Sequence, residues 1–372
     1  MACVKNPLEL PELLDQTLGL VHARRDLCAS ALVSRSWVHP AQSRLFSSVE
    51  LRSGSREMAL LLPILQHSPH LVQFISALAV TFYSVDTTHP SKIMNLPFSR
   101  LTTLDIRTIN DPSTAPLFKL LKVPSLVDVT IFTAFKEWDE FAQIWEGCST
   151  AIQHLSLRLV MEQPALPTHS TVPIGVHRPI KLKSFGGQIP ADKIAPWLFD
   201  PRCAFDISNL KALQLYKPGL LTLLDLSAES LDSIELLSLT ISHAFDASLP
   251  RFHHVTQLDI EPKVQTLDPS NIDYMSRNIP PIVRHRISAV RFHESGSSPD
   301  YLGSLGEQLS KLHDCFPQLR IVMINFRQGY GQRDAELFKS RARALNWRVD
   351  PRVTVRYNFD WENRIPWYSK IL

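Results

Sequence analysis

The segment INFRQGYGQRDAELFKSRA, Ile324 to Ala342, has the spacing closest to a chemical motif. An expected strand, a Gly-x-Gly turn and an expected helix follow one another as in a dinucleotide-binding turn, with Asp360 further along. However, Asp334 stands where the third glycine belongs, and its carboxylate would repel a pyrophosphate. Only residues 335–372 follow, too few for the doubly wound sheet that such a turn opens. We therefore expect an ordinary turn and no cofactor.

Neither the histidines nor the serine-rich stretch forms a recognisable metal-binding or catalytic motif. No pair among His253, His254, His285 and His293 has the one-turn helical spacing of a metal motif. The serine-rich stretch ESGSSPDYLGSLG, Glu294 to Gly306, contains no G-x-S-x-G nucleophile elbow. We expect surface histidines and a surface loop.

The cysteines are scattered, odd in number and never in C-x-x-C spacing: Cys3, Cys28, Cys148, Cys203 and Cys315. This pattern indicates neither a disulfide framework nor a zinc site, and it suits a reducing compartment. Cys148 and Cys315 each end an expected helical segment, which favours a packing role. We therefore predict no catalytic, cofactor-binding or metal-binding residue, and no enzyme.

The composition is that of a globular chain. Its 372 residues are 44% hydrophobic and 20% charged, with a formal net charge of +3. Without a dense basic run, nucleic acid is not an expected partner. The apolar stretch MALLLPIL, Met58 to Leu65, is too short to span a bilayer, and the acidic, proline-containing N-terminus does not look like a signal peptide. We expect a cytoplasmic or nuclear protein with no membrane partner.

Three short helices are expected near the N-terminus. Leucines recur at helical spacing in LELPELLDQTLGLV, Leu8 to Val21, with Pro11 placed as a first-turn proline. A second helix is expected from Asp26 to Val38, ended by Pro40, and a third carries Leu45 and Phe46. Helices this short cannot bury all their apolar faces, so some should face a partner or the next domain.

This segment resembles the F-box, in the style common in fungal proteins, over about Leu8 to Leu51. The match lies in L-P-E-L-L, then A-L-V-S-R-S-W, then P-A-Q-x-x-L-F-x-x-V. The resemblance implies docking on the Skp adaptor of cullin-RING (SCF-type) ubiquitin ligases. It places these residues at binding or supporting positions: Leu10, Pro11, Leu13, Leu14, Leu32, Val33 and Trp37.

Trp37 has two interpretations. It is either an amphipathic anchor that closes the helical module and reaches the adaptor, or a plug at the join to the following domain. The sequence departs from the F-box pattern in the short loop HARRD, His22 to Asp26, and in Ser34, where relatives often carry Cys.

Residues 53–345 contain a repeated pattern, apolar-x-x-apolar-x-apolar. Copies begin at Ile75, Leu101, Leu126, Ile152, Leu210, Leu231, Val255, Ile287 and Leu319, with a degraded copy, LKSFGG, at Leu182. They resemble leucine-rich repeats, which implies a curved α/β solenoid, or horseshoe, of short strands and connecting helices. The asparagine or cysteine that follows each strand in regular repeats is missing, so we expect an irregular solenoid.

Such a solenoid presents the residues that alternate with its core leucines on the concave side. They mix both charges with two aromatic residues, which suits a protein substrate better than nucleic acid. The candidates are Asp105, Arg107, Asp128, Phe132, His154, Arg158, Gln214, Tyr216, Asp259, Glu261, Arg291 and His293.

Residues 346–372 concentrate aromatic side chains, which we expect to cap the last repeat, with a docking tail as the alternative. The predicted domains are thus an F-box at 1–52, a leucine-rich-repeat-like solenoid at 53–345 and the cap. The predicted function is a substrate-recognition adaptor that binds the Skp adaptor, the cullin scaffold and an unknown protein substrate. The alternative is an F-box protein that binds the Skp adaptor without a cullin.

Overall fold

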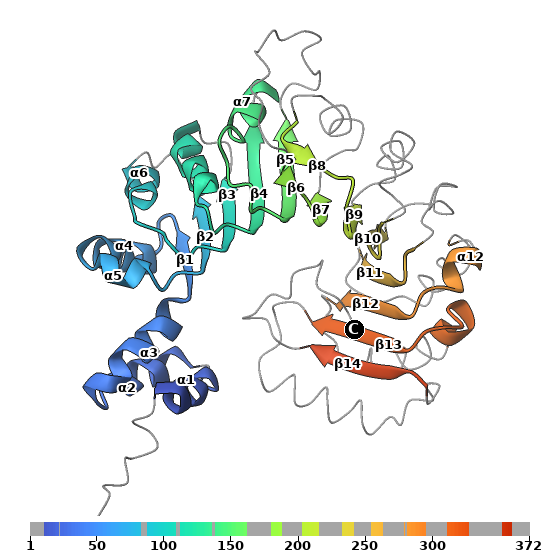
Figure 1. The fold of residues 1–372 in the computed structure, drawn as a ribbon, viewed down its shortest axis with the longest axis horizontal. Helices are drawn as coiled ribbons and strands as arrows, with labels where there is room; N and C mark the ends of the chain where they lie inside the picture. The colour runs from blue at the N-terminus through green and yellow to red at the C-terminus, as the bar shows by residue number, and fades with distance from the viewer. Residues whose placement is uncertain are drawn as a thin grey trace, which may run out of the picture. The chain divides into compact units, whose positions relative to one another are not determined.

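A computed structural model describes most of the chain (Figure 1). The described residues are 11–21, 23–82, 88–108, 112–135, 138–161, 180–187, 203–215, 233–241, 254–262, 279, 281–294, 311–326 and 352–358. The chain divides into two compact units, Met1–Ile180 and Lys181–Leu372. None of the helices within the described ranges is long and apolar enough to cross a membrane.

The first unit opens with three helices: α1 (Pro11–Gly19), α2 (Arg24–Ser30) and α3 (Arg35–Phe46). They enclose a small core of their own, because Leu14, Leu18, Leu27 and Ala41 are each at most 5% exposed and cluster together. The partly buried Val21, Ala31, Trp37 and Leu45 pack against that cluster.

The prediction of one helix from Asp26 to Val38 was wrong, because two helices, α2 and α3, cover this segment. The chain turns at residues 31–33, and α3 starts after Ser34, whose backbone is extended. Pro40 lies inside α3 instead of ending α2. Because α3 begins only at Arg35, Pro40 follows its first turn and removes just one backbone hydrogen bond.

A parallel sheet follows in the same unit. Its strands pair in chain order: β1 (Ser48–Arg52), β2 (Ala77–Phe82), β3 (Thr103–Thr108), β4 (Asp128–Phe135) and β5 (His154–Met161). Helical segments connect them: α4 (Arg56–His67), α5 (Pro69–Val72), α6 (Thr88–Met94), the 3-10 helix η2 (Pro112–Lys122) and α7 (Trp138–Gln143).

One face of this sheet is covered by the connecting helices. On β4 the buried positions alternate with half-buried ones through Val129, Ile131, Thr133 and Phe135. Phe118 of η2 and Phe141 of α7 both contact Phe135, with ring centroids 5.8 and 5.3 Å away. The opposite face of β1–β5, which we call the open face, carries half-buried and exposed side chains among its described residues, apart from the buried Thr81.

The second unit also contains parallel strands in chain order: β7 (Ser184–Gly187), β9 (Ala212–Leu215), β10 (Leu236–Ile241), β11 (Gln257–Pro262), β12 (Ala289–Glu294), β13 (Ile321–Phe326) and β14 (Thr354–Asn358). Two short strands, β6 (Ile180–Lys181) and β8 (Phe205–Asp206), form a separate sheet. A short helix, α12 (Pro281–Arg284), precedes β12, and residues 311–315 are helical.

The prediction of a mixed α/β chain built on repeated strands is confirmed, with corrections at three strands. The copy expected at Leu231 starts at Ile234, because Ile234 is buried and β10 begins at Leu236. Two further strands, β1 and β14, extend the series before and after the predicted copies. Across the described parts of both units, twelve strands lie in chain order.

Candidate functional site

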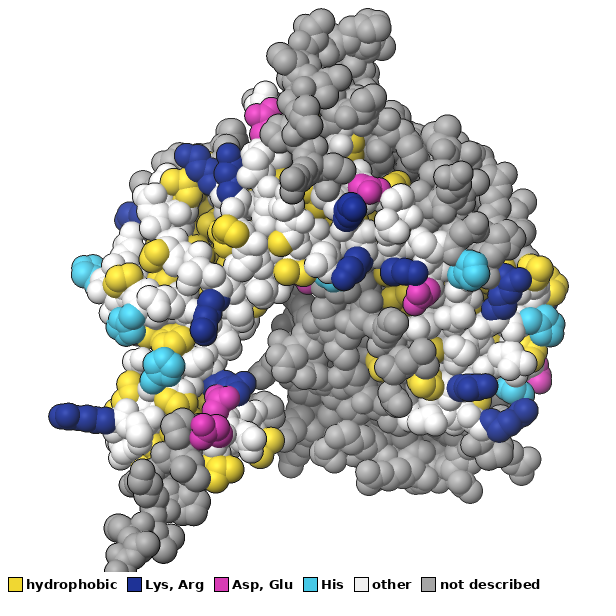
Figure 2. Space-filling model, viewed as in Figure 1, with side chains coloured by type: hydrophobic (Ala, Val, Ile, Leu, Met, Phe, Trp, Pro, Cys, Tyr) yellow, Lys and Arg dark blue, Asp and Glu magenta, His cyan; other side chains and the backbone are white. Residues whose placement is uncertain are grey.

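The helical segment α1–α3 carries apolar side chains on its surface (Figure 2). Within the described residues, seven large hydrophobic side chains are exposed, and four of them belong to this segment: Leu13 (41%), Leu20 (79%), Leu32 (87%) and Val33 (64%). We call these four residues the apolar surface set. Full burial of an exposed Leu or Val side chain is favourable by roughly 1.5–3 kcal/mol before the costs of association, so this set can support binding to a partner.

Backbone hydrogen bonds in the turn after α2 fix the positions of two members of the set, Leu32 and Val33. The Leu32 N–H donates to the Ala29 carbonyl at 3.0 Å, and the Val33 N–H donates to the Ser30 carbonyl at 3.1 Å. These bonds fix the backbone of two residues that do not belong to the core cluster. Both side chains are thus presented on an ordered turn, which lowers the conformational entropy lost on binding.

The other predicted adaptor-binding residues have different surroundings. Leu14 is 2% exposed in the helical core, and Trp37 packs against that core while remaining half-buried, so both support the module from inside. Pro11 begins α1, and Leu10 lies outside the described residues. Both interpretations of Trp37 remain open.

The open face of β1–β5 brings half of the predicted substrate-face residues together, six of the twelve. Strand register places Asp128 beside His154, and it places Phe132 between Arg107 on β3 and Arg158 on β5. The Arg158 guanidinium lies over the Phe132 ring, 4.5 Å from its centroid. Parallel pairing in chain order therefore gathers residues that are 25 or 26 positions apart (Arg107, Phe132, Arg158).

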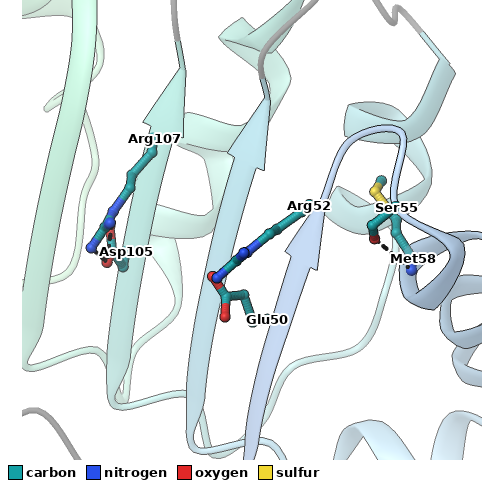
Figure 3. A network of polar contacts seen from close by, with 6 residues as sticks. All are labelled: Glu50, Arg52, Ser55, Met58, Asp105 and Arg107. Carbon is teal, nitrogen blue, oxygen red and sulfur yellow. Dashed lines mark hydrogen bonds and ion pairs between the residues drawn. The ribbon is translucent and has the colours of Figure 1, made fainter. Parts of the chain in front are cut away.

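Ion pairs within single strands order two of the arginines (Figure 3). The Arg107 Nη2 donates to the Asp105 Oδ2 at 2.6 Å, and its Nε donates to the same carboxylate. The Arg52 Nε donates to the Glu50 Oε1 at 2.8 Å. Residues two apart on a strand share a face, so each arginine bends back along its own strand to reach its carboxylate.

Glu50 and Arg52 were missed in the sequence. The pattern Phe46-x-x-Val49-x-Leu51 that marks β1 has the same spacing as the other copies, but it lies within the segment matched to the F-box. The spacing itself was the signal that could have found this strand.

In the second unit, Arg291 does not lie on an exposed substrate face as predicted. This side chain is fully buried, and its strand neighbours Val290 and Phe292 are buried as well, so both faces of β12 are covered here. The prediction that Arg291 faces solvent was therefore wrong, because alternation identifies the outward face only where the other face stays uncovered.

The remaining candidates of the second unit are placed only by their strands. Gln214 on β9 is half-buried, Asp259 and Glu261 belong to β11, and His293 belongs to β12. Tyr216 lies outside the described residues.

The thiols of Cys148 and Cys315 are poor nucleophiles. Burial raises the pKa of each to about 11, although Lys122 near Cys148 and Arg284 near Cys315 act in the opposite direction. At neutral pH both thiols are therefore protonated. No three His, Cys, Asp or Glu side chains gather as metal ligands within the described ranges.

Comparison with known proteins adds no relative to this description. The chain matches no family model and no curated protein sequence.

Proposed function

We propose that this chain is the substrate-recognition adaptor of an SCF-type ubiquitin ligase. In this proposal α1–α3 form an F-box that docks on the Skp adaptor, and the strand repeats form an irregular leucine-rich-repeat solenoid that binds a protein substrate. The observation that carries the proposal is the apolar surface set on a helical segment with its own core.

The proposal assigns no chemistry to the chain itself. A receptor of this kind increases the rate of ubiquitin transfer by holding an acceptor lysine close to a charged conjugating enzyme, which raises the effective concentration of the lysine. The thiols of Cys148 and Cys315 fit this assignment, since their raised pKa values keep them protonated.

Co-purification with the recombinant Skp adaptor and the cullin tests the proposal. The test variant is Leu32→Glu with Val33→Glu, because both side chains are exposed and their loss leaves the helical core intact. The matched control is Leu60→Glu with Ile64→Glu, which replaces two exposed apolar side chains on α4 (59% and 47%). Thermal unfolding of each variant checks that it folds.

We expect the wild type and the α4 control to recover both partners, and the Leu32/Val33 variant to recover neither. Recovery of the adaptor without the cullin would instead support an F-box protein that acts outside a ligase. Recovery of neither partner by the folded wild type would overturn the F-box assignment.

A further inference from the structure

Three arginines stand in one row across the open face of the first unit. Strand register aligns Arg52 with Thr81, Thr81 with Arg107, Arg107 with Phe132, and Phe132 with Arg158. We call Arg52, Arg107 and Arg158 the arginine row. Their side chains reach solvent: those of Arg52 and Arg107 are 52% and 36% exposed, and Arg158 is exposed.

We propose that the arginine row binds an extended acidic segment of a partner protein, with a carboxylate or phosphoryl group at every third residue. This inference names the substrate class of the proposed receptor and so rests on the proposed function.

The spacing of the row supports a repeat of three residues. Neighbouring strands lie about 4.8 Å apart, so arginines on every second strand recur at about 9.6 Å. In a polyproline II segment, residues three apart lie on the same side and are separated by about 9.3 Å. The backbone spacing of the row thus matches the segment's repeat, and the long arginine side chains can reach anionic groups at every third position.

Contacts within the sheet order the arginine side chains of the row before a ligand binds. Glu50 and Asp105 fix the directions of the Arg52 and Arg107 side chains through their ion pairs. Among the described residues, the contact of the Arg158 guanidinium is with the Phe132 ring and not with a carboxylate. A planar guanidinium has five N–H donors in a fixed fork, so a guanidinium that is ordered in advance loses less conformational freedom when it binds a carboxylate or phosphate.

The charges beside the row favour a peptide over a nucleic acid. Strand register aligns Glu50 with Ala79, Ala79 with Asp105, and Asp105 with Thr130. Both carboxylates contact the row directly, Glu50 at 2.8 Å from the Arg52 Nε and Asp105 at 2.6 Å from the Arg107 Nη2. A nucleic-acid backbone carries a charge on every nucleotide and would bring phosphates against these carboxylates. A peptide with an acidic side chain only at every third position places fewer negative charges beside Glu50 and Asp105, so its repulsion is smaller.

Fluorescence anisotropy with labelled peptides and the full chain, without adaptor, tests the inference. One peptide repeats Glu-Pro-Pro, a second has the same composition with its glutamates contiguous, and a third carries phosphoserine in place of glutamate. We expect the repeating glutamate peptide to bind about fivefold or more tightly than the contiguous one, because only its charges match the row. The phosphoserine peptide distinguishes phosphoryl from carboxylate recognition, and tighter binding of either repeating peptide than of the contiguous one supports the inference.

Variants with equal charge change separate the row from general electrostatics. The test variant replaces Arg52, Arg107 and Arg158 by Gln, and the control replaces the exposed Arg56, Arg100 and Lys119 by Gln. We expect the test variant to lose about tenfold or more in affinity and the control to stay within about twofold. Arg158→Gln alone, at an exposed position, should lose about threefold and guards against misfolding of the triple variant.

Several results would overturn the inference. Equal affinity for the repeating and contiguous peptides, equal losses in the two triple variants, or no binding of either repeating peptide would each do so. Displacement of the peptide by a single-stranded oligonucleotide at lower concentration would assign the row to nucleic acid instead. Because no adaptor is present, failure here is distinct from failure of the co-purification.

Discussion

Ser55 controls the start of α4 through a single hydrogen bond. Its Oγ accepts from the Met58 N–H at 3.1 Å, while its backbone is extended as in a helix N-cap (Figure 3). Ser55→Ala removes this bond and should lower the free energy of unfolding by about 1 kcal/mol. Urea denaturation measures the change, and Ser55→Asp, which keeps an accepting oxygen, is the control. Equal stability of the wild type and the Ala variant would show that the cap contributes nothing.

Single residues also show where sequence reasoning was limited. The types and spacing of Arg107, Phe132 and Arg158 identified them as outward-facing, and the structure brings them together. The same reasoning was wrong for Arg291, since burial of both sheet faces depends on what covers them and not on the alternation within β12. The exposure of Leu32 and Val33 depends on a turn inside a segment that was predicted as one helix.

At the scale of elements, a pair of buried hydroxyls links β3 to β4. Thr108 and Thr133 are 1% and 4% exposed, and their Oγ1 atoms are hydrogen-bonded to each other. Thr133→Val leaves the Thr108 hydroxyl buried without this partner and should cost about 1–3 kcal/mol. Replacing both by Val should cost less than the single change, because no unpaired hydroxyl then remains. Urea denaturation of the four proteins in this cycle measures the coupling, and strictly additive losses would contradict it.

Elements with a strong repeated pattern were predictable, and those at the ends of the series were not. Apolar spacing located β2 to β5 because each strand buries one face against the helices that follow. β1 lies within the segment that was matched to the F-box and was therefore not predicted as a strand. β14 lies in a segment whose aromatic residues suggested a cap. The register of β10 was displaced by three residues because both Leu231 and Ile234 fit the apolar pattern.

At the scale of the whole molecule, the proposal joins two kinds of surface within the first unit. The apolar surface set suits a stable protein partner, because its apolar side chains reward burial. The arginine row suits a ligand chosen by charge and spacing, because its guanidiniums are ordered and partly exposed. The two surfaces have no residue in common, so variants of one should leave binding at the other unchanged.

The most direct test of the central claim is the dissociation constant of the full chain with the recombinant Skp adaptor, measured by calorimetry for the wild type, Leu32→Glu and Leu60→Glu. The claim predicts measurable binding by the wild type, a loss of about tenfold or more in Leu32→Glu, and a change within about twofold in Leu60→Glu. Absence of binding by the folded wild type, or equal losses in the two variants, would contradict it.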